Sequence, residues 1–150
     1  MKKNILILIG FFILVTVVIV LTAGNNSVSG VEMTMYKSPS CGCCVGNSQI
    51  LNADGFDVEV IPTEDMKSIK AKYNIPRDME SCHTSIIGGY FVEGHIPTEI
   101  INKLLEEQPY IDGIALPNMP AGSPGMPGTK SYEWTIYALK DGKSSVYMKY

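Results

Sequence analysis

The feature that most constrains this chain is an uncharged, almost wholly apolar run at residues 5–23. At about 1.5 Å per residue, a helix of this run nearly crosses a hydrocarbon core of about 30 Å. Lys2 and Lys3 precede the run, and no other basic residue follows until Lys37. The positive-inside rule then places the N-terminus in the cytoplasm and the remainder outside it. We therefore predict a single-pass anchor in the cell membrane; the alternative is a cleaved signal peptide that releases a secreted or periplasmic protein.

The chain thus divides into an anchor or signal segment with a short polar linker, residues 1–30, and one domain of ordinary size, residues 31–150. The domain carries 10 basic against 15 acidic residues. An acidic domain without a basic patch argues against nucleic acid as a partner. Outside the cytoplasm the compartment is oxidising, so structural disulfides remain an alternative for the cysteines.

Strand and helix patterns alternate along the domain. Apolar periodicity and capping residues predict, in order, strand 31–36, helix 45–53, strand 57–61, a helix between Thr63 and Asn74, strands 84–87 and 90–93, and a helix that Pro97 opens at its first position. This order, β-α-β-α-β-β-α, is that of the thioredoxin-like fold. A Pro- and Gly-rich loop at residues 117–128 and a β-hairpin at residues 132–150 follow, and the sequence does not place this hairpin.

All four cysteines and one of the two histidines fall into two short clusters. The first, the cysteine-rich segment, contains Cys41, Cys43 and Cys44; the second, the Cys-His pair, is Cys82 and His83. In the predicted topology the third strand runs antiparallel beside the first, so its start lies against the end of the first strand. Because neighbouring strands are about 4.8 Å apart, we expect the two clusters to lie within side-chain reach.

The cysteine spacing permits two kinds of chemistry. Cys41 and Cys44 have the C-x-x-C spacing of a redox disulfide at a helix N-terminus. The adjacent side chains of Cys43 and Cys44 are expected to diverge, which would prevent one tetrahedral ion from taking all four sulfurs easily. Diverging thiolates favour bridging sulfurs and more than one soft ion. Cu(I) suits thiolate, thioether and imidazole ligands, and we expect His83 to be a ligand beside Cys82.

Three further residues are candidate ligands on weaker grounds. Met119 and Met126 lie in a short internal repeat of the Pro-rich loop, and this loop could fold over the site. The two methionines are either ligands or residues that fill hydrophobic gaps. His95 follows the fourth strand on the same rim, roughly 10 Å from the first strand. We expect it to line the outer edge of the site rather than to share an ion with Cys41.

Four motifs, in the same order, resemble the CopG copper-resistance family: YKSPSCGCC from residue 36, SCHT from 81, EGHIP from 93 and MPAGSPGM from 119. This exported metal-binding family has long been catalogued as a domain of unknown function. The resemblance covers nearly all of residues 36–150. It implies a thioredoxin-like domain that serves copper tolerance outside the cytoplasm. The ligands it implies are Cys41, Cys43, Cys44 and Cys82, with His83 nearby.

We therefore predict an extracytoplasmic copper-binding protein rather than an enzyme, with Cu(I)/Cu(II) redox activity left open. The predicted partners are copper ions, the membrane and other copper-handling proteins. Two alternatives remain: a membrane-tethered thiol-disulfide oxidoreductase that uses Cys41 and Cys44, and a domain held by two structural disulfides, such as Cys41–Cys44 and Cys43–Cys82.

Overall fold

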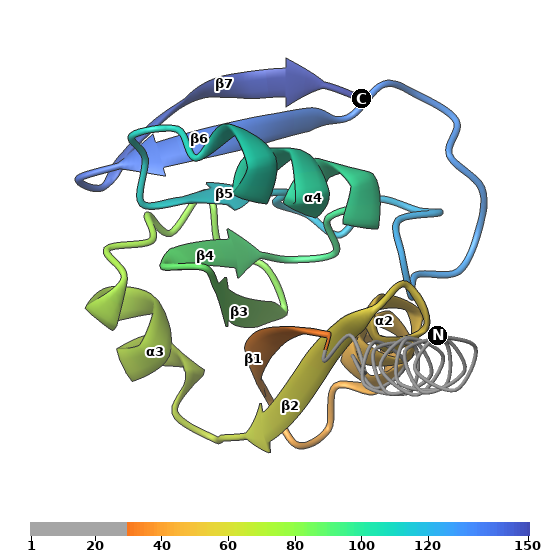
Figure 1. Cartoon of the computed structure of the whole chain (residues 1–150). Helices are drawn as coiled ribbons and strands as arrows, with labels where there is room; N and C mark the ends of the chain where they lie inside the picture. Colours follow the sequence, from red (N-terminus) through yellow and green to blue (C-terminus); the bar gives the residue numbers. More distant parts are fainter. Residues whose placement is uncertain (1–29) are drawn as a thin grey trace, which may run out of the picture.

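The computed structural model describes residues 30–150, and Figure 1 shows how their helices and strands are arranged. The predicted anchor at residues 5–23 and most of the linker lie outside the described residues. Within residues 30–150, no helix combines the length and the apolar character that a membrane span requires.

The described residues form a mixed α/β fold of three helices and one seven-stranded sheet. In chain order the elements are β1 (Val31–Lys37), α2 (Gly42–Ala53), β2 (Phe56–Pro62), α3 (Met66–Lys72), β3 (His83–Ile87), β4 (Tyr90–Glu93), α4 (Thr98–Glu107), β5 (Gly113–Ala115), β6 (Thr135–Lys140) and β7 (Lys143–Lys149). The first seven follow the predicted order.

The sheet order is β2-β1-β3-β4-β5-β6-β7. This order brings the cysteine-rich segment and the Cys-His pair to the same end of the sheet. β1 is parallel to β2 and antiparallel to β3, with Lys37 opposite His83. The last residue of β1 therefore lies beside the first residue of β3. The loop that leads from β1 into α2 and the chain that enters β3 meet at this end of the sheet.

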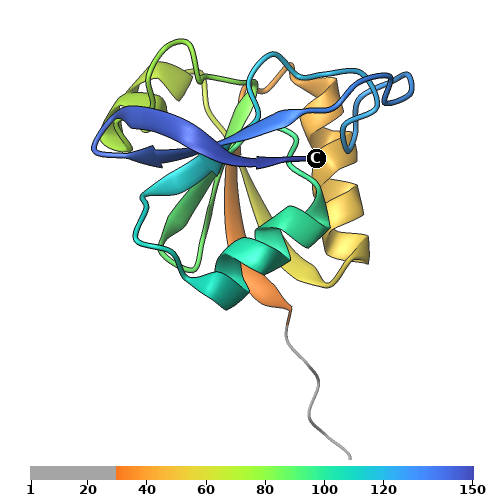
Figure 2. The same ribbon diagram turned by 90° about the horizontal axis from the view of Figure 1, so that it is seen from above.

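Side chains that alternate along the strands build a core on each face of the sheet. On one face, Val92 packs in a cluster with Leu51 of α2 and Leu104 of α4. On the other face, the neighbouring Phe91 packs with Ile75, which follows α3. In the view from above, α3 lies to the left of the strands and α2 to the right (Figure 2). With both faces covered, the polar ends of the strands are where a site can open to solvent.

Three helix starts differ from the prediction. α2 begins at Gly42, three residues earlier than expected, because Cys41 has the extended backbone of an N-cap (φ −74°, ψ 97°). Asp65 rather than Thr63 caps α3, since its carboxylate accepts a hydrogen bond from the Ser68 N–H at 3.0 Å. Pro97 is the N-cap of α4 rather than its first helical residue. The earlier start of α2 matters for the site, because it places Cys43 and Cys44 in the first helical turn.

β5 was not predicted, and it decides where the final hairpin lies. It has three residues, too few to show an alternating pattern, and it pairs parallel with β4 and antiparallel with β6. The hairpin of β6 and β7 thereby extends the sheet beyond β4. Its turn has Asp141 and Gly142 at φ 51° and 72°, as the Asp-Gly signal predicts for a type I′ turn.

Candidate metal centre

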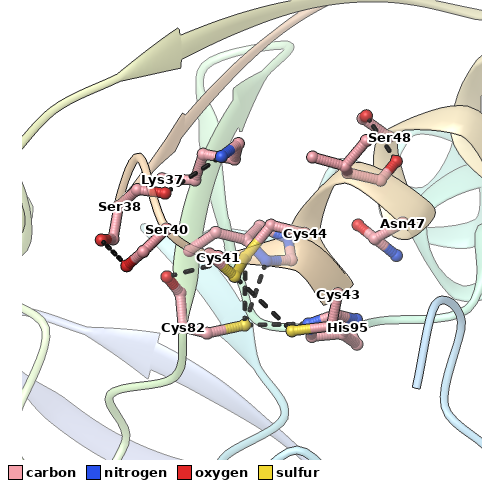
Figure 3. The surroundings of a disulfide bond; sticks show 12 residues. Lys37, Ser38, Ser40, Cys41, Cys43, Cys44, Asn47, Ser48, Cys82 and His95 are labelled. Atoms are coloured by element: carbon pink, nitrogen blue, oxygen red, sulfur yellow. Dashed lines mark hydrogen bonds between the residues drawn. A yellow bond between two sulfur atoms is a disulfide. The ribbon is translucent and has the colours of Figure 1, made fainter. Parts of the chain in front are cut away.

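The cysteine-rich segment and the Cys-His pair meet at the end of the sheet. The Sγ atom of Cys44 lies 3.5 Å from Sγ of Cys82, although the residues are 38 positions apart. The Sγ atoms of Cys41 and Cys43 are also 3.5 Å apart. Figure 3 shows the side chains of Cys82, Cys43 and His95 gathered beneath the sulfurs of Cys41 and Cys44. The two segments therefore meet at the end of the sheet, as the predicted topology requires.

Cys41 and Cys44 form a disulfide, while Cys43 and Cys82 are free thiols. The second disulfide of the structural alternative, Cys43–Cys82, is thus not formed. The disulfide joins the N-cap residue of α2 to its first turn, and no side chain caps this helix end. The free N–H groups and the helix dipole there favour thiolates once the disulfide is reduced.

The four sulfurs converge, and the expectation that Cys43 and Cys44 diverge is wrong. The Sγ atoms of Cys41, Cys43, Cys44 and Cys82 all lie within 4.8 Å of one another. Successive residues on a helix are rotated by about 100°, not by the 180° of a strand. The side chain of Cys82, the residue before β3, can therefore face both Cys43 and Cys44. We call these four sulfurs the sulfur group.

A second set of donors overlaps the first. The ligand atoms of Cys44, Cys82, His83 and His95, which we call the mixed group, also lie within 4.8 Å of one another. Cys82 Sγ is 3.5 Å from Nδ1 of His83 and 2.8 Å from Nε2 of His95. The two imidazole rings meet edge to face at 4.9 Å. Cys44 and Cys82 belong to both groups, so the six side chains form one continuous cluster.

His95 lies deeper in the site than its distance from β1 suggested. β3 and β4 are antiparallel neighbours, so the residue before β3 and the residues after β4 flank adjacent strand ends. Gly94 turns the chain at φ 84°, and its N–H donates to the His83 carbonyl at 3.0 Å. This turn folds the imidazole of His95 back over Cys82. Within the described residues His95 shares a group with Cys44 rather than with Cys41.

The Pro-rich loop fixes the orientation of His95. Nδ1 of His95 donates to the carbonyl oxygen of Pro124 at 2.6 Å, and Nδ2 of Asn47 donates to the same oxygen at 3.1 Å. Because Nδ1 carries the proton, Nε2 presents its lone pair to Cys82 or to a metal. One carbonyl thus links α2, the loop and the imidazole.

The electrostatics of the site keep both imidazoles neutral. Burial lowers the pKa of His83 to about 3, with smaller contributions from His95 and Lys70. Burial also lowers the pKa of His95, and the hydrogen bond to Pro124 partly opposes it. Burial and the neighbouring Cys43 raise the pKa of Cys82 to about 12. At neutral pH both histidines are therefore ready to bind a metal, whereas Cys82 must release a proton to do so.

The loop that carries both candidate methionines packs against α2. The backbone of Gly125 lies very close to α2. A Cβ atom on Gly125 would lie 2.5 Å from the backbone nitrogen of Asn47 and 2.7 Å from the carbonyl oxygen of Cys43. Met126 follows this contact, and Met119 lies near the start of the loop; both are half-buried. Their role as ligands stays a prediction.

Sequence reasoning missed a buried ion pair next to the site. Lys70 of α3 and Glu93 of β4 form a salt bridge in which both side chains are at least 94% buried. Two signs of it were present in the sequence. Lys70 lies on the same helical face as Met66 and Tyr73, and Glu93 ends an otherwise apolar strand.

This chain is similar to known proteins both in its sequence family and in its structure. Residues 79–126 match a family described as "Protein of unknown function, DUF411". Two solved structures, named "Copper resistance protein copG- Form 1" and "Form 2", each align with a TM-score of 0.74 and 37% sequence identity. Each alignment covers 81% of this chain and 98% of the other. No curated protein sequence matches this chain.

Proposed function

Since this chain belongs to the CopG copper-resistance family, we propose that it binds copper outside the cytoplasm and contributes to copper resistance. The observation that carries this proposal is the overlap of the two donor groups at Cys44 and Cys82. Four sulfurs and two imidazoles within one cluster make a soft donor set, and thiolate and imidazole both suit Cu(I).

The donor set favours more than one copper ion. A structural zinc site uses four ligands around one ion. Here six donors fall into two groups of four, and the shared sulfurs of Cys44 and Cys82 can each contact two ions. The proposed ligands are Cys41, Cys43, Cys44, Cys82, His83 and His95. Copper loading requires the reduced protein, since the disulfide occupies the sulfurs of Cys41 and Cys44.

The exposure of the donors indicates from which side copper enters. His83 and His95 are 1% and 0% exposed, whereas Cys41, Cys43 and Cys82 are half-buried. Copper would therefore first meet the sulfur side of the cluster, from solvent or from another copper-handling protein. We further propose that residues 31–150 form a thioredoxin-like domain and that residues 5–23 hold it at the outer face of the membrane.

The methionines are proposed as additional soft donors. Met126 is the stronger of the two, because the backbone of its neighbour Gly125 is in contact with Cys43. Replacement of Met126 by Leu should weaken Cu(I) binding relative to the wild type, and the same change at Met119 should weaken it less. Wild-type affinity in both variants would assign the methionines to packing.

Metal analysis of the full-length chain tests the proposal. The protein is purified without oxygen under reducing conditions, loaded with Cu(I) and analysed for bound metal and by X-ray absorption. We expect copper bound by sulfur and nitrogen, and loss of copper when Cys82 is replaced by Ser. Copper at background level in the reduced wild-type protein would refute the proposal.

A thiol-disulfide oxidoreductase is the second candidate, and one observation favours it. The free thiol of Cys82 lies 3.5 Å from Cys44 of the disulfide, within the reach of thiol-disulfide exchange. The high pKa of Cys82, about 12, argues against fast attack because the thiolate is the nucleophile. Reduction of insulin by the metal-free protein, lost in Cys41→Ser and kept in His83→Gln, would support this candidate.

A further inference from the structure

A buried carboxylate joins the two strands that carry the mixed group. Oε1 of Glu93 pairs with the Lys70 ammonium and accepts the Ser81 N–H at 2.5 Å. Oε2 of Glu93 accepts the hydroxyl of Thr84 at 2.6 Å. Glu93 is 0% exposed, and Lys70 Nζ also contacts the Thr84 hydroxyl at 3.3 Å. Both carboxylate oxygens are therefore occupied by donors from other segments.

These donors lie next to the candidate ligands along the chain. Ser81 precedes Cys82, and Thr84 follows His83. Glu93 is itself two residues before His95, and the turn at Gly94 between them is tight. A Cβ atom on Gly94 would meet the Ser81 hydroxyl at 2.6 Å. The Glu93 carboxylate thus accepts hydrogen bonds from Ser81, before the Cys-His pair, and from Thr84, after it. Glu93 is also the residue that precedes the turn at Gly94, which leads to His95.

We propose that Glu93 is a positioning residue that holds Cys82, His83 and His95 at the spacing of the mixed group. This inference rests on the proposed copper site for its function, but its geometric part concerns the metal-free protein. Groups behind metal ligands that fix their orientation typically affect metal affinity about 10- to 100-fold. Burial raises the pKa of the Glu93 carboxyl overall, whereas Lys70 and the donors Thr84 and Ser81 favour its ionised form.

Positioning must be separated from stability, because removal of one partner leaves a buried charge unpaired. Such a change is strongly destabilising, whereas replacement of both partners by apolar groups is often neutral. The test therefore uses two double variants of the full-length chain. Lys70→Met/Glu93→Leu removes the acceptor of the Ser81 N–H, while Lys70→Met/Glu93→Gln keeps a carbonyl oxygen at that place.

The first measurement needs no copper. In the oxidised protein, Cys82 and Cys43 are both free thiols, and peptide mapping by mass spectrometry separates their alkylation rates. We expect Lys70→Met/Glu93→Leu to raise the rate at Cys82 about tenfold, because the contact of Cys82 with His95 loosens. Cys43 lies on α2 and is the internal control. The Gln double variant should stay within about threefold of the wild type.

The second measurement is Cu(I) affinity, by competition with a colorimetric chelator, together with X-ray absorption. The Leu double variant should bind about 10- to 100-fold more weakly and lose nitrogen ligands while it keeps sulfur ligands. Asp112→Asn is the matched control, since Asp112 pairs with Lys140 at 2.6 Å and accepts the Asp141 N–H at 2.6 Å, away from the cluster. It should leave both readouts unchanged.

Each outcome separates the inference from the proposed function. An unchanged Cys82 rate in a folded Leu double variant overturns the positioning role, whatever the protein binds. A raised Cys82 rate with no copper in the wild type supports the positioning role and refutes the copper site. If the Leu double variant does not fold, Thr84→Val decides, because it removes the hydroxyl contacts to Oε2 of Glu93 and to Nζ of Lys70 but keeps the Lys70–Glu93 pair. An unchanged rate at Cys82 in that variant also overturns the inference.

Discussion

The sulfur of Cys82, which belongs to both donor groups, lies 2.8 Å from Nε2 of His95. His95 Nδ1 donates to Pro124, so the Nε2 lone pair accepts the S–H of Cys82 in the metal-free protein. A metal ion bound to both residues would take the place of the proton between Sγ of Cys82 and Nε2 of His95. Cys82, like Cys44, is therefore a donor whose loss should affect both groups, whereas Cys43 belongs only to the sulfur group.

Replacement of Cys82 by Ser should weaken Cu(I) binding more than replacement of Cys43 by Ser. We expect a loss of at least about 100-fold for Cys82→Ser, because a shared soft donor is removed from both groups. Competition with a Cu(I) chelator at fixed pH measures both affinities, and Cys43→Ser is the matched control. Equal losses in the two variants would contradict a shared role for Cys82.

The oxidation state of the Cys41–Cys44 pair should control copper loading. The oxidised protein should show two reactive thiols on denaturation, from Cys43 and Cys82, and four after reduction. Reduction restores two thiolates to the sulfur group, so Cu(I) affinity should rise by at least about 100-fold. Thiol titration and chelator competition on the same sample check both statements. Four thiols before any reduction would show that the disulfide does not form.

His83 should make the metal-free protein less stable in mild acid. Its pKa is lowered from 6.5 to about 3 in the folded state, so between these values only the unfolded chain binds the proton. Stability from this group is complete above pH 6.5 and is lost as the pH falls towards 3. The expected slope is about 1.4 kcal/mol per pH unit. The lowered pKa of His95 acts in the same direction.

Urea unfolding of the oxidised, metal-free protein at pH 7.5, 6.5 and 5.5 measures this slope. The control is His83→Gln, in which the other titrating groups remain and their contributions cancel in the difference. The wild type should lose more stability between pH 6.5 and 5.5 than the variant does. Parallel curves would mean that His83 is solvated enough to take its proton in the folded state.

The sequence predicted the meeting of the two clusters because strand pairing is a strong constraint. Once the third strand runs antiparallel to the first, Cys82 must enter beside the end of β1, and the pairing of Lys37 with His83 shows this. The C-x-x-C spacing of Cys41 and Cys44 left the disulfide between them as an alternative, and the structure forms it. Between the predicted strands 84–87 and 90–93, the pair Gly88-Gly89 is a two-residue hairpin signal, and both glycines have the positive φ of such a turn, 56° and 86°.

Features that depend on tertiary contacts could not be predicted in the same way. The buried position of His95 depends on the backbone angle of Gly94 and on the hydrogen bond to the Pro124 carbonyl. Neither feature produces a periodic pattern in the sequence from which it could be predicted. The pair of Lys70 and Glu93 needs two elements to pack before it can be seen. β5 has only three residues, and its place depends on partners on both sides.

The contact of Gly125 with α2 gives the last prediction. Gly125 has φ 84°, and a Cβ atom there would lie 2.5 Å from the Asn47 nitrogen. Gly125→Ala should therefore displace Pro124 and release Nδ1 of His95. Gly89→Ala is the matched control, because its φ is 86° but nothing lies within 4 Å of its Cβ position. The control should cost about 1 kcal/mol of unfolding free energy from the backbone angle alone.

Gly125→Ala should cost more, about 1–3 kcal/mol beyond the control, and should also lower Cu(I) affinity about tenfold because the imidazole loses its anchor. Urea unfolding and chelator competition measure the two effects, and X-ray absorption should show fewer nitrogen ligands. A variant with lowered stability but unchanged copper affinity would mean that Cys82 and the metal orient His95 without the loop. Such a result would separate the role of the loop in folding from its role at the site, because Gly89→Ala shares only the backbone cost.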